Sequence, residues 1–418
     1  MELPYSARTR HVYIAGKSGY GKSTIEYWMA LQDIANGYAV AVIDPNGDLV
    51  DQLLNHIPKK RVDDVIYLDG LDPIPLDFMA WEGDPTILAD DLLIMFRRLC
   101  TESDWGVRMD AITNFAILAI LEAHRPFLDI YKLITDDRFR NAVILPAIRQ
   151  KEALYHFWKP RDQGGEFENM SRDAASPVTT RMAKFVLNPN LSTALGHPNP
   201  ILRIPTVVEK NQVLLVNLAK MGEKAGNVYG SLIVSQLQQF IFKRKDRSNP
   251  LYIYVDEFQD FSTSSFGRIL SQARKFNLGL TLANQHPKQI PDLIDDIKGC
   301  VSSFILFRMD AGHARELASA IRPYKPEDLE GLAKFRALYR PAEGQPSFIT
   351  IPKPPDPPSD VQLEQARYIR KRTVDNYACQ PVPEPVSLGQ DVPPDPPRRP
   401  AANPTGRPQK IPPYRGKK

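Results

Sequence analysis

Residues 16–24 read Gly16-Lys17-Ser18-Gly19-Tyr20-Gly21-Lys22-Ser23-Thr24 and match the pattern G-x-x-x-x-G-K-[ST]. An apolar run at 12–15 precedes them, and a helix-like run at 25–36 follows. This context suits a phosphate-binding loop, because glycines let successive backbone N–H groups face a phosphate chain at the positive end of a helix dipole. We therefore predict a nucleotide site in which Lys22 reaches the β and γ phosphates and Ser23 binds Mg²⁺.

A second motif is an apolar strand, 251–255, that ends in Asp256 and Glu257. Two adjacent buried carboxylates need a cation opposite them, and Mg²⁺ held by Ser23 and a phosphate would supply it. We expect Asp256 to bind the metal through its water shell and Glu257 to orient and polarise the attacking water. The pair favours hydrolysis of ATP over storage of nucleotide. The alternative is a strand that ends in a solvated acidic turn.

Polar residues after two further strands are candidates for the same site. Gln285 ends the run 278–284, where an amide can contact the γ-phosphate and the water and report hydrolysis. Phosphoryl transfer also uses an arginine, often from a neighbouring subunit. We prefer Arg274 for this role and keep Arg308, which follows the strand 301–307, as the second candidate. For each, an ordinary surface charge is the competing interpretation.

The segment Asp44-Pro45-Asn46-Gly47-Asp48 follows the strand 39–43. These residue types are those of a tight turn, so composition alone favours a structural role for Asp44.

The composition is that of a globular protein, with 418 residues, 43% hydrophobic and 24% charged. A net charge of +4 is too small to indicate nucleic acid by itself. Cys100, Cys300 and Cys379 are scattered, which argues against a disulfide framework or a zinc site and favours a reducing cytosol. The most apolar stretch, 111–123, is too short to span a membrane. We expect a cytoplasmic protein whose membrane association, if any, comes through a partner.

The order of strand-like and helix-like runs predicts an α/β fold with a mainly parallel sheet. We expect residues 1–81 and 206–351 to form one nucleotide-binding domain, closed by a β-hairpin at 335–339 and 347–351. Residues 82–205 are expected to form an inserted all-α domain. From residue 352 to 418 the chain holds 17 of its 38 prolines and a basic end, which predicts a disordered tail.

In this order the motifs resemble the FtsK–HerA superfamily of hexameric DNA-pumping ATPases. They are most similar to the cytoplasmic part of type IV secretion coupling proteins of the TraG/TraD kind. The resemblance covers roughly residues 10–350 and is carried by the segments 14–24, 40–50, 254–259, 270–275 and 280–285. It implies a RecA-like P-loop ATPase domain, ATP and Mg²⁺ as cofactors, Asp44 as a neighbour of the active site, and Arg274 as the arginine that acts between subunits.

The same resemblance implies partners: DNA, further copies in a homo-hexameric ring, and relaxase or secretion-channel proteins. The basic group Lys243, Arg244, Lys245 and Arg247 is a candidate channel lining, or a set of cations at a helix C-terminus. Coupling proteins carry two membrane helices before the ATPase, whereas about ten residues precede the first strand here. The alternatives are a HerA-like motor in DNA-end processing and a nucleotide-gated module that recruits proteins.

Overall fold

The computed structural model describes residues 8–72, 74–79, 84–98, 106–170, 172–244, 246–261 and 265–378. These residues form two compact units, one from residues up to Gly70 together with 204–375, and one from Leu71–Arg203. No helix within the described ranges is long and apolar enough to cross a membrane.

The first unit is built on a nine-stranded sheet with the order β3-β4-β2-β5-β6-β1-β7-β8-β9. Neighbours from β3 to β7 pair in parallel, whereas β8 and β9 are antiparallel and form the expected hairpin. The strands are β1 Val12–Ala15, β2 Ala39–Asp44, β3 Val65–Leu68, β4 Val213–Asn217, β5 Leu251–Val255, β6 Leu278–Asn284, β7 Ser303–Leu306, β8 Arg336–Arg340 and β9 Ser347–Thr350.

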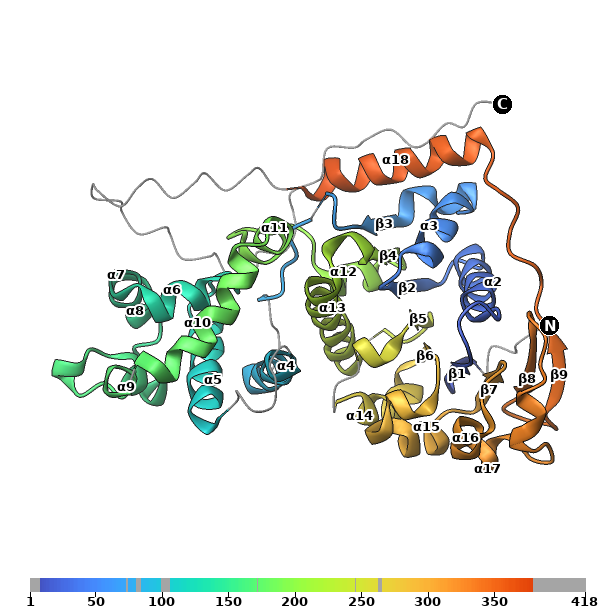
Figure 1. The fold of residues 1–418 in the computed structure, drawn as a ribbon. Helices are drawn as coiled ribbons and strands as arrows, with labels where there is room; N and C mark the ends of the chain where they lie inside the picture. Colours follow the sequence, from blue (N-terminus) through green and yellow to red (C-terminus); the bar gives the residue numbers. More distant parts are fainter. Residues whose placement is uncertain are drawn as a thin grey trace. The chain divides into compact units, whose positions relative to one another are not determined.

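Every residue of β1 to β7 is buried, because helices cover both faces of the parallel part of the sheet. Figure 1 shows α12 and α13 on one face and α2 and α3 on the other. The helices of this unit are α2 Lys22–Ala35, α3 Asp48–Asn55, α12 Ile204–Glu209, α13 Glu223–Lys243, α14 Ser265–Gln272, α15 Ile294–Cys300, α16 Ala311–Ala314, α17 Ala318–Ile321 and α18 Asp360–Tyr377.

The prediction of a disordered tail from residue 352 is wrong for α18. No proline occurs between Ser359 and Gln380, and the buried side chains Ala366, Ile369 and Thr373 recur at helical spacing. The composition of residues 352–418 does not indicate this helix, because prolines are frequent on both sides of it. The remainder of the predicted tail, 379–418, lies outside the described residues.

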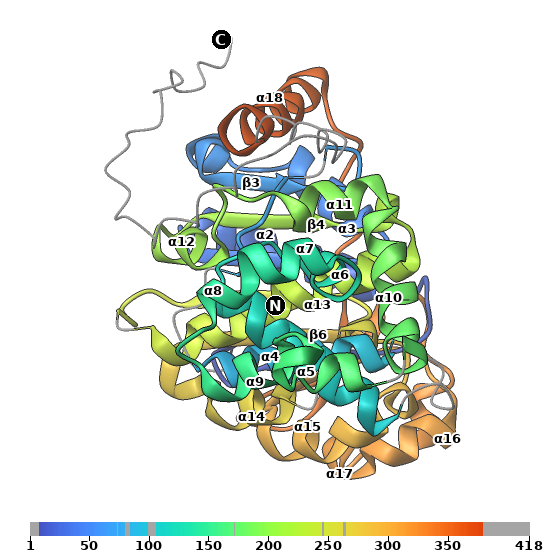
Figure 2. The ribbon, with the colours of Figure 1, turned by 90° about the vertical axis from the view of Figure 1, so that its left-hand side faces the viewer.

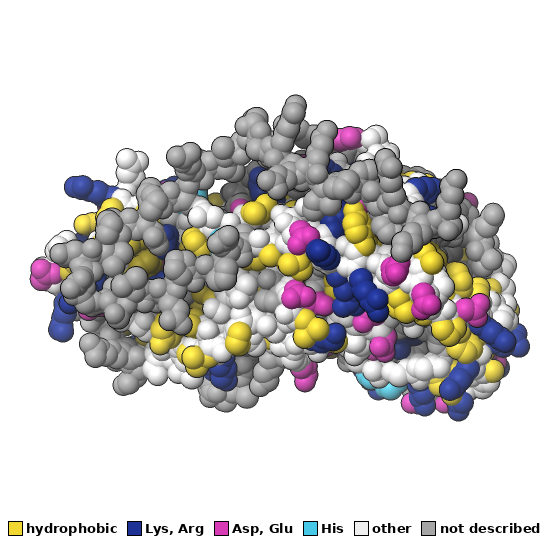
Figure 3. All heavy atoms as spheres, turned by 90° about the horizontal axis from the view of Figure 1, so that it is seen from above, with side chains coloured by type: hydrophobic (Ala, Val, Ile, Leu, Met, Phe, Trp, Pro, Cys, Tyr) yellow, Lys and Arg dark blue, Asp and Glu magenta, His cyan; other side chains and the backbone are white. Residues whose placement is uncertain are grey.

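Helix α18 packs beside the edge strand β3. The N–H of Tyr67 donates to the hydroxyl oxygen of Thr373 over 3.2 Å, which satisfies a strand group that has no neighbouring strand on that side. Arg370 of α18 pairs with Asp51 and Asp69. On this side of the molecule, seen from above in Figure 3, described basic side chains lie next to acidic ones.

The second unit is helical in its described parts, and Figure 2 faces it. Helix α10 packs against α5, α6 and α11. This unit begins at Leu71, about ten residues before the predicted boundary at 82. The stretch after Gly70 packs with the second unit, because Leu76 forms a β-bridge with Leu202 and the N–H of Leu76 donates to the carbonyl of Ala194. The helices are α4 Pro85–Arg98, α5 Val107–Glu122, α6 Asp129–Thr135, α7 Asp137–Phe139, α8 Leu145–Ala147, α9 Glu152–Trp158, α10 Arg172–Val186 and α11 Pro189–Gly196.

Candidate nucleotide site

The carboxyl ends of the parallel strands lie at one edge of the sheet, which is where α/β folds of this kind bind ligands. Strand β1 leads into Gly16, β2 ends at Asp44, β5 leads into Asp256, and β6 leads into Gln285. The candidate residues on these strands therefore meet at one edge.

The glycine-rich loop is held between the ends of β6 and β7. The N–H of Gly16 donates to the carbonyl of Gln285 over 3.1 Å, and the N–H of Lys17 donates to that of Arg308 over 2.8 Å. Gly16 has φ +149°, and a Cβ there would lie 2.5 Å from Cβ of Phe307. No larger residue fits this close approach, so the loop keeps its backbone facing the edge of the sheet.

Lys22 and Ser23 open α2 and face the acidic strand end. The hydroxyl of Ser23 lies 3.4 Å from Oδ2 of Asp256, so the structure brings the two predicted metal ligands together. The buried ammonium of Lys22 donates to the carbonyl of Gly16 over 2.9 Å. Both side chains that would meet a nucleotide thus lie on the first turn of one helix.

Asp256 is 4% exposed, and its Oδ1 accepts from the N–H of Glu257 over 2.9 Å. Burial raises its pKa from 3.8 to about 7, and the charges of Asp44 and Glu257 act in the same direction. Carboxylates therefore gather at this strand end, where a bound cation would stabilise their charged forms.

Glu257 and Gln285 are brought together as well. Nε2 of Gln285 lies 3.5 Å from Oε1 of Glu257, and Nε2 of Gln259 donates to Oε2 over 2.9 Å. Glu257 has φ 44°, a left-handed conformation that non-glycine residues adopt at a cost of about 1–3 kcal/mol. Strain of this kind clusters at functional sites, and the sequence carries no signal for it.

Asp44 has a structural role in the turn after β2. Its carboxylate accepts from the N–H groups of Asn46, Leu49 and Val50 over 2.8, 2.8 and 3.2 Å. Burial raises its pKa, although these hydrogen bonds oppose the shift. Asp44 thus caps the start of α3 and adds negative charge beside Asp256; a direct contact with nucleotide stays a prediction.

The two candidate arginines lie in different places. Arg308 is exposed at the end of β7, where its guanidinium donates to the hydroxyl of Tyr20 over 3.0 Å and lies over that ring. Arg274 belongs to the short helix Ala273–Phe276, just before β6 begins. Gln285 follows the other end of β6, roughly 20 Å away for a strand of this length. The chain therefore does not bring Arg274 to its own site.

Two residues of the basic group before β5, Arg244 and Arg247, make contacts within the chain. Arg244 is 7% exposed and donates to the carbonyl of Asn249 over 2.6 Å. Arg247 donates to the carbonyl of Lys275 and lies over the ring of Phe276. Lys245 lies outside the described residues.

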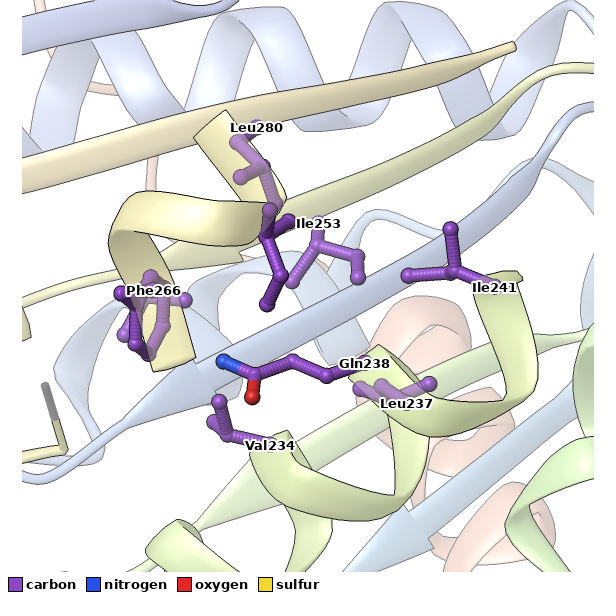
Figure 4. A pocket seen from close by; sticks show the side chains of 9 residues that line it. Val234, Leu237, Gln238, Ile241, Ile253, Phe266 and Leu280 are labelled. Carbon is purple, nitrogen blue, oxygen red and sulfur yellow. The ribbon is translucent and has the colours of Figure 1, made fainter. Parts of the chain in front are cut away.

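A small apolar cavity lies between α13, α14 and the strands β5 and β6 (Figure 4). Ile253 and Val255 of β5 face it, and Gln238 supplies the amide in its lining. Its lining contains no charged side chain, so it offers nothing for phosphate or metal. It also shows which residues of β5 point away from α2, because Tyr252 and Tyr254 pack in the core that includes α2.

Sequence reasoning missed Glu26 on the second turn of α2. It is completely buried, and burial raises its pKa well above the usual value, with Asp256 as the next cause. A glutamate four residues after Lys22 on a helix shares its face, which was the available signal.

No family model matches the chain, and no curated protein matches its sequence. The folded architecture does match solved structures. The bacterial conjugative coupling protein TrwBdeltaN70, in its unbound form, has a TM-score of 0.63 at 15% identity and covers 84% of this chain and 87% of its own. The TrwB coupling protein in complex with ADP and Mg²⁺ has a TM-score of 0.62 at 15% identity, with the same coverage.

VirB4 of Thermoanaerobacter pseudethanolicus is also similar, with a TM-score of 0.56 at 13% identity, covering 85% of this chain and 91% of that one. At these identities the likeness is one of fold. The predicted fold class, a RecA-like α/β P-loop fold with a mainly parallel sheet, is therefore confirmed. The resemblance to coupling proteins holds at the level of fold over most of the chain.

Proposed function

We propose that the chain is a P-loop ATPase that uses ATP hydrolysis to move DNA in conjugative transfer. One observation supports this most directly: the loop that ends in Lys22 and Ser23 and the strand that ends in Asp256 and Glu257 meet at one sheet edge, with Ser23 3.4 Å from Asp256. The TrwB coupling protein, whose fold is similar, is known in complex with ADP and Mg²⁺.

The residues present fit a magnesium nucleotide. The donor set, a hydroxyl and a carboxylate, is of the oxygen type that Mg²⁺ prefers. Among the described residues no three acidic, histidine or cysteine side chains form a self-sufficient metal site. This fits Mg²⁺, which protein sites usually hold by one or two carboxylates while substrate phosphates and waters complete the shell. When bound, the nucleotide supplies the phosphoryl group and the metal neutralises its charge.

The roles of the chain's own residues follow from their positions. Lys22 exchanges its hydrogen bond to Gly16 for the β and γ phosphates, which turns a buried internal contact into a phosphate clamp. Glu257 accepts a proton from water and orients it, and its contact with Gln285 lets the amide respond to hydrolysis. The Gly16 backbone, through its bond to Gln285, connects that response to the loop.

We propose that Arg274 acts on the site of a neighbouring copy. Its place at the amino end of β6 supports this role, since it is remote from its own glycine-rich loop. A homo-hexameric ring would supply such neighbours and a central channel for DNA, whose phosphates would provide most of the affinity. Relaxase or secretion-channel proteins are the proposed partners, in the cytoplasm and next to a membrane that a partner supplies.

ATP hydrolysis by the purified chain tests this proposal, measured with and without single- and double-stranded DNA. We expect magnesium-dependent hydrolysis that DNA stimulates, and loss of turnover and of nucleotide binding in Lys22→Ala. The exposed Lys59→Ala, remote from the loop, is the control and keeps wild-type turnover. Hydrolysis that Lys22→Ala leaves intact would refute the site, and hydrolysis indifferent to any DNA would refute the motor.

A further inference from the structure

One face of α2 carries a stripe of buried residues that begins in the nucleotide site. Lys22, Glu26, Ala30 and Asp33 follow one another at spacings of four, four and three, so they share one side of the helix. Their exposed fractions are 6%, 0%, 0% and 0%. Asp33 accepts from the hydroxyl of Tyr254 on β5, which places this stripe on the side of α2 that meets the sheet.

Two acids of the sheet point toward the same face. Side chains alternate along a strand, so Asp256 lies on the same side as Tyr254, and Asp44 on the same side as Val42. Tyr254 and Val42 pack in the core that includes α2. Glu26 therefore lies on the helix face that meets Asp44 and Asp256, and the charge of Asp256 acts on it more strongly than that of any other residue.

Both carboxylate oxygens of Glu26 are buried and have no hydrogen-bond partner. Buried acids in folded proteins are almost always paired, because an unpaired one is costly. Lys22, the cation on the same stripe, donates to the carbonyl of Gly16 instead. Since the other nearby charges are those of carboxylates, the group that this environment lacks is a cation.

We propose that Glu26 is a further residue of the magnesium site, which acts with Ser23 and Asp256 to raise the affinity for Mg²⁺ when nucleotide is bound. The inference rests on the proposed function. It is compatible with the absence of a self-sufficient acidic site in the described residues, because Mg²⁺ keeps several waters and a carboxylate can act on it through them. Glu26 is a positioning residue in this account and does not touch the reacting atoms.

The test is Mg²⁺ affinity in the presence of saturating ADP, measured by calorimetry in wild type and in Glu26→Gln. We expect the variant to bind Mg²⁺ about 10- to 100-fold more weakly, as is usual when a supporting residue of a metal site is removed. Affinity for ADP without metal is expected to stay unchanged, since Lys22 and the loop remain. Asp33→Asn, an equally buried acid on the same stripe, is the matched control; at a temperature at which circular dichroism shows it to be folded, it keeps wild-type Mg²⁺ affinity.

A role in packing alone predicts a different result, namely equal Mg²⁺ affinity in wild type and Glu26→Gln, which would overturn the proposal. Glu26→Met fills a similar volume without a polar atom and gives the answer if Glu26→Gln does not fold. A folded variant that loses metal-free ADP binding would also overturn it, because Glu26 would then support the loop. Wild type that binds no ADP would instead refute the proposed function itself.

Discussion

Helix α2 carries one buried acid near each end, and the two differ in whether they have hydrogen-bond partners. Asp33 accepts hydrogen bonds from the guanidinium of Arg8 and, over 2.6 Å, from the hydroxyl of Tyr254. Glu26, seven residues earlier and equally buried, has no hydrogen-bond partner for either oxygen. A buried carboxylate costs several kcal/mol unless it is paired. Asp33 is thus paired within the chain alone, whereas the unpaired state of Glu26 is consistent with the proposal that a bound ion pairs with it.

The largest expected effect is on the rate of ATP hydrolysis, in the variant Glu257→Gln, whose residue lies in the turn after β5 near the Glu26 end of α2. A general base contributes about 100- to 10,000-fold to a rate, so turnover should fall by that factor while ATP stays bound. Single-turnover hydrolysis and equilibrium ATP binding measure the two quantities. Turnover within a few-fold of wild type would move the base to another residue.

At the other end, Asp33→Asn is expected to lower the free energy of unfolding. Arg8 is 7% exposed and would keep its charge without a carboxylate, a loss typically of about 3–5 kcal/mol. Denaturant unfolding of the nucleotide-free protein measures this loss. Glu26→Gln is the opposite case, because removing an unpaired buried acid should raise the free energy of unfolding. If Asp33→Asn and wild type had equal free energies of unfolding, the hydrogen bonds of Asp33 would not stabilise the fold, and the two acids of α2 would not differ in this respect.

A smaller effect is a pH dependence of stability without nucleotide and magnesium. The pKa of Asp256 is raised to about 7 in the folded chain, so between pH ~4 and ~7 the folded state holds a proton that the unfolded state has lost. The free energy of unfolding should therefore be highest below pH ~4, fall by at most about 4 kcal/mol up to pH ~7, and then level off.

Unfolding of wild type and Asp256→Asn from pH 5 to 8 measures this slope. The variant should be the more stable protein at pH 8 and should show a flatter profile. The pKa of Glu26 is also raised, so Glu26 makes the free energy of unfolding fall with pH as well, and part of the pH dependence should remain in the variant. Parallel profiles would mean that Asp256 does not carry the effect.

Much of the fold could be predicted from residue patterns. The strands 12–15 and 251–255 match the structure residue for residue, because fully buried parallel strands read as unbroken apolar runs. Helix α18 escapes prediction from composition because the segment 352–418 is rich in proline on both sides of it. The start of the helical unit was misplaced because nothing in residues 71–79 signals that Leu76 pairs with Leu202.

The site could be predicted only in part. Motif spacing and strand ends indicated that Ser23 and Asp256 would meet, and the structure brings them together. For Glu26 the spacing of four from Lys22 indicated a shared helix face but not burial, because a glutamate inside a helix usually faces solvent. The contact of Arg308 with Tyr20 and the left-handed backbone of Glu257 depend on tertiary packing that no local pattern encodes.

The hydroxyl of Thr373 that accepts the N–H of Tyr67 has a practical consequence. Ending the chain near residue 358, at the first group of prolines, would remove α18 from its place beside β3. The exposed edge of β3 could then pair with strands of other molecules. Such a fragment would be prone to precipitate, although its nucleotide motifs were intact. A shortened version meant for crystallisation should retain the chain through Tyr377.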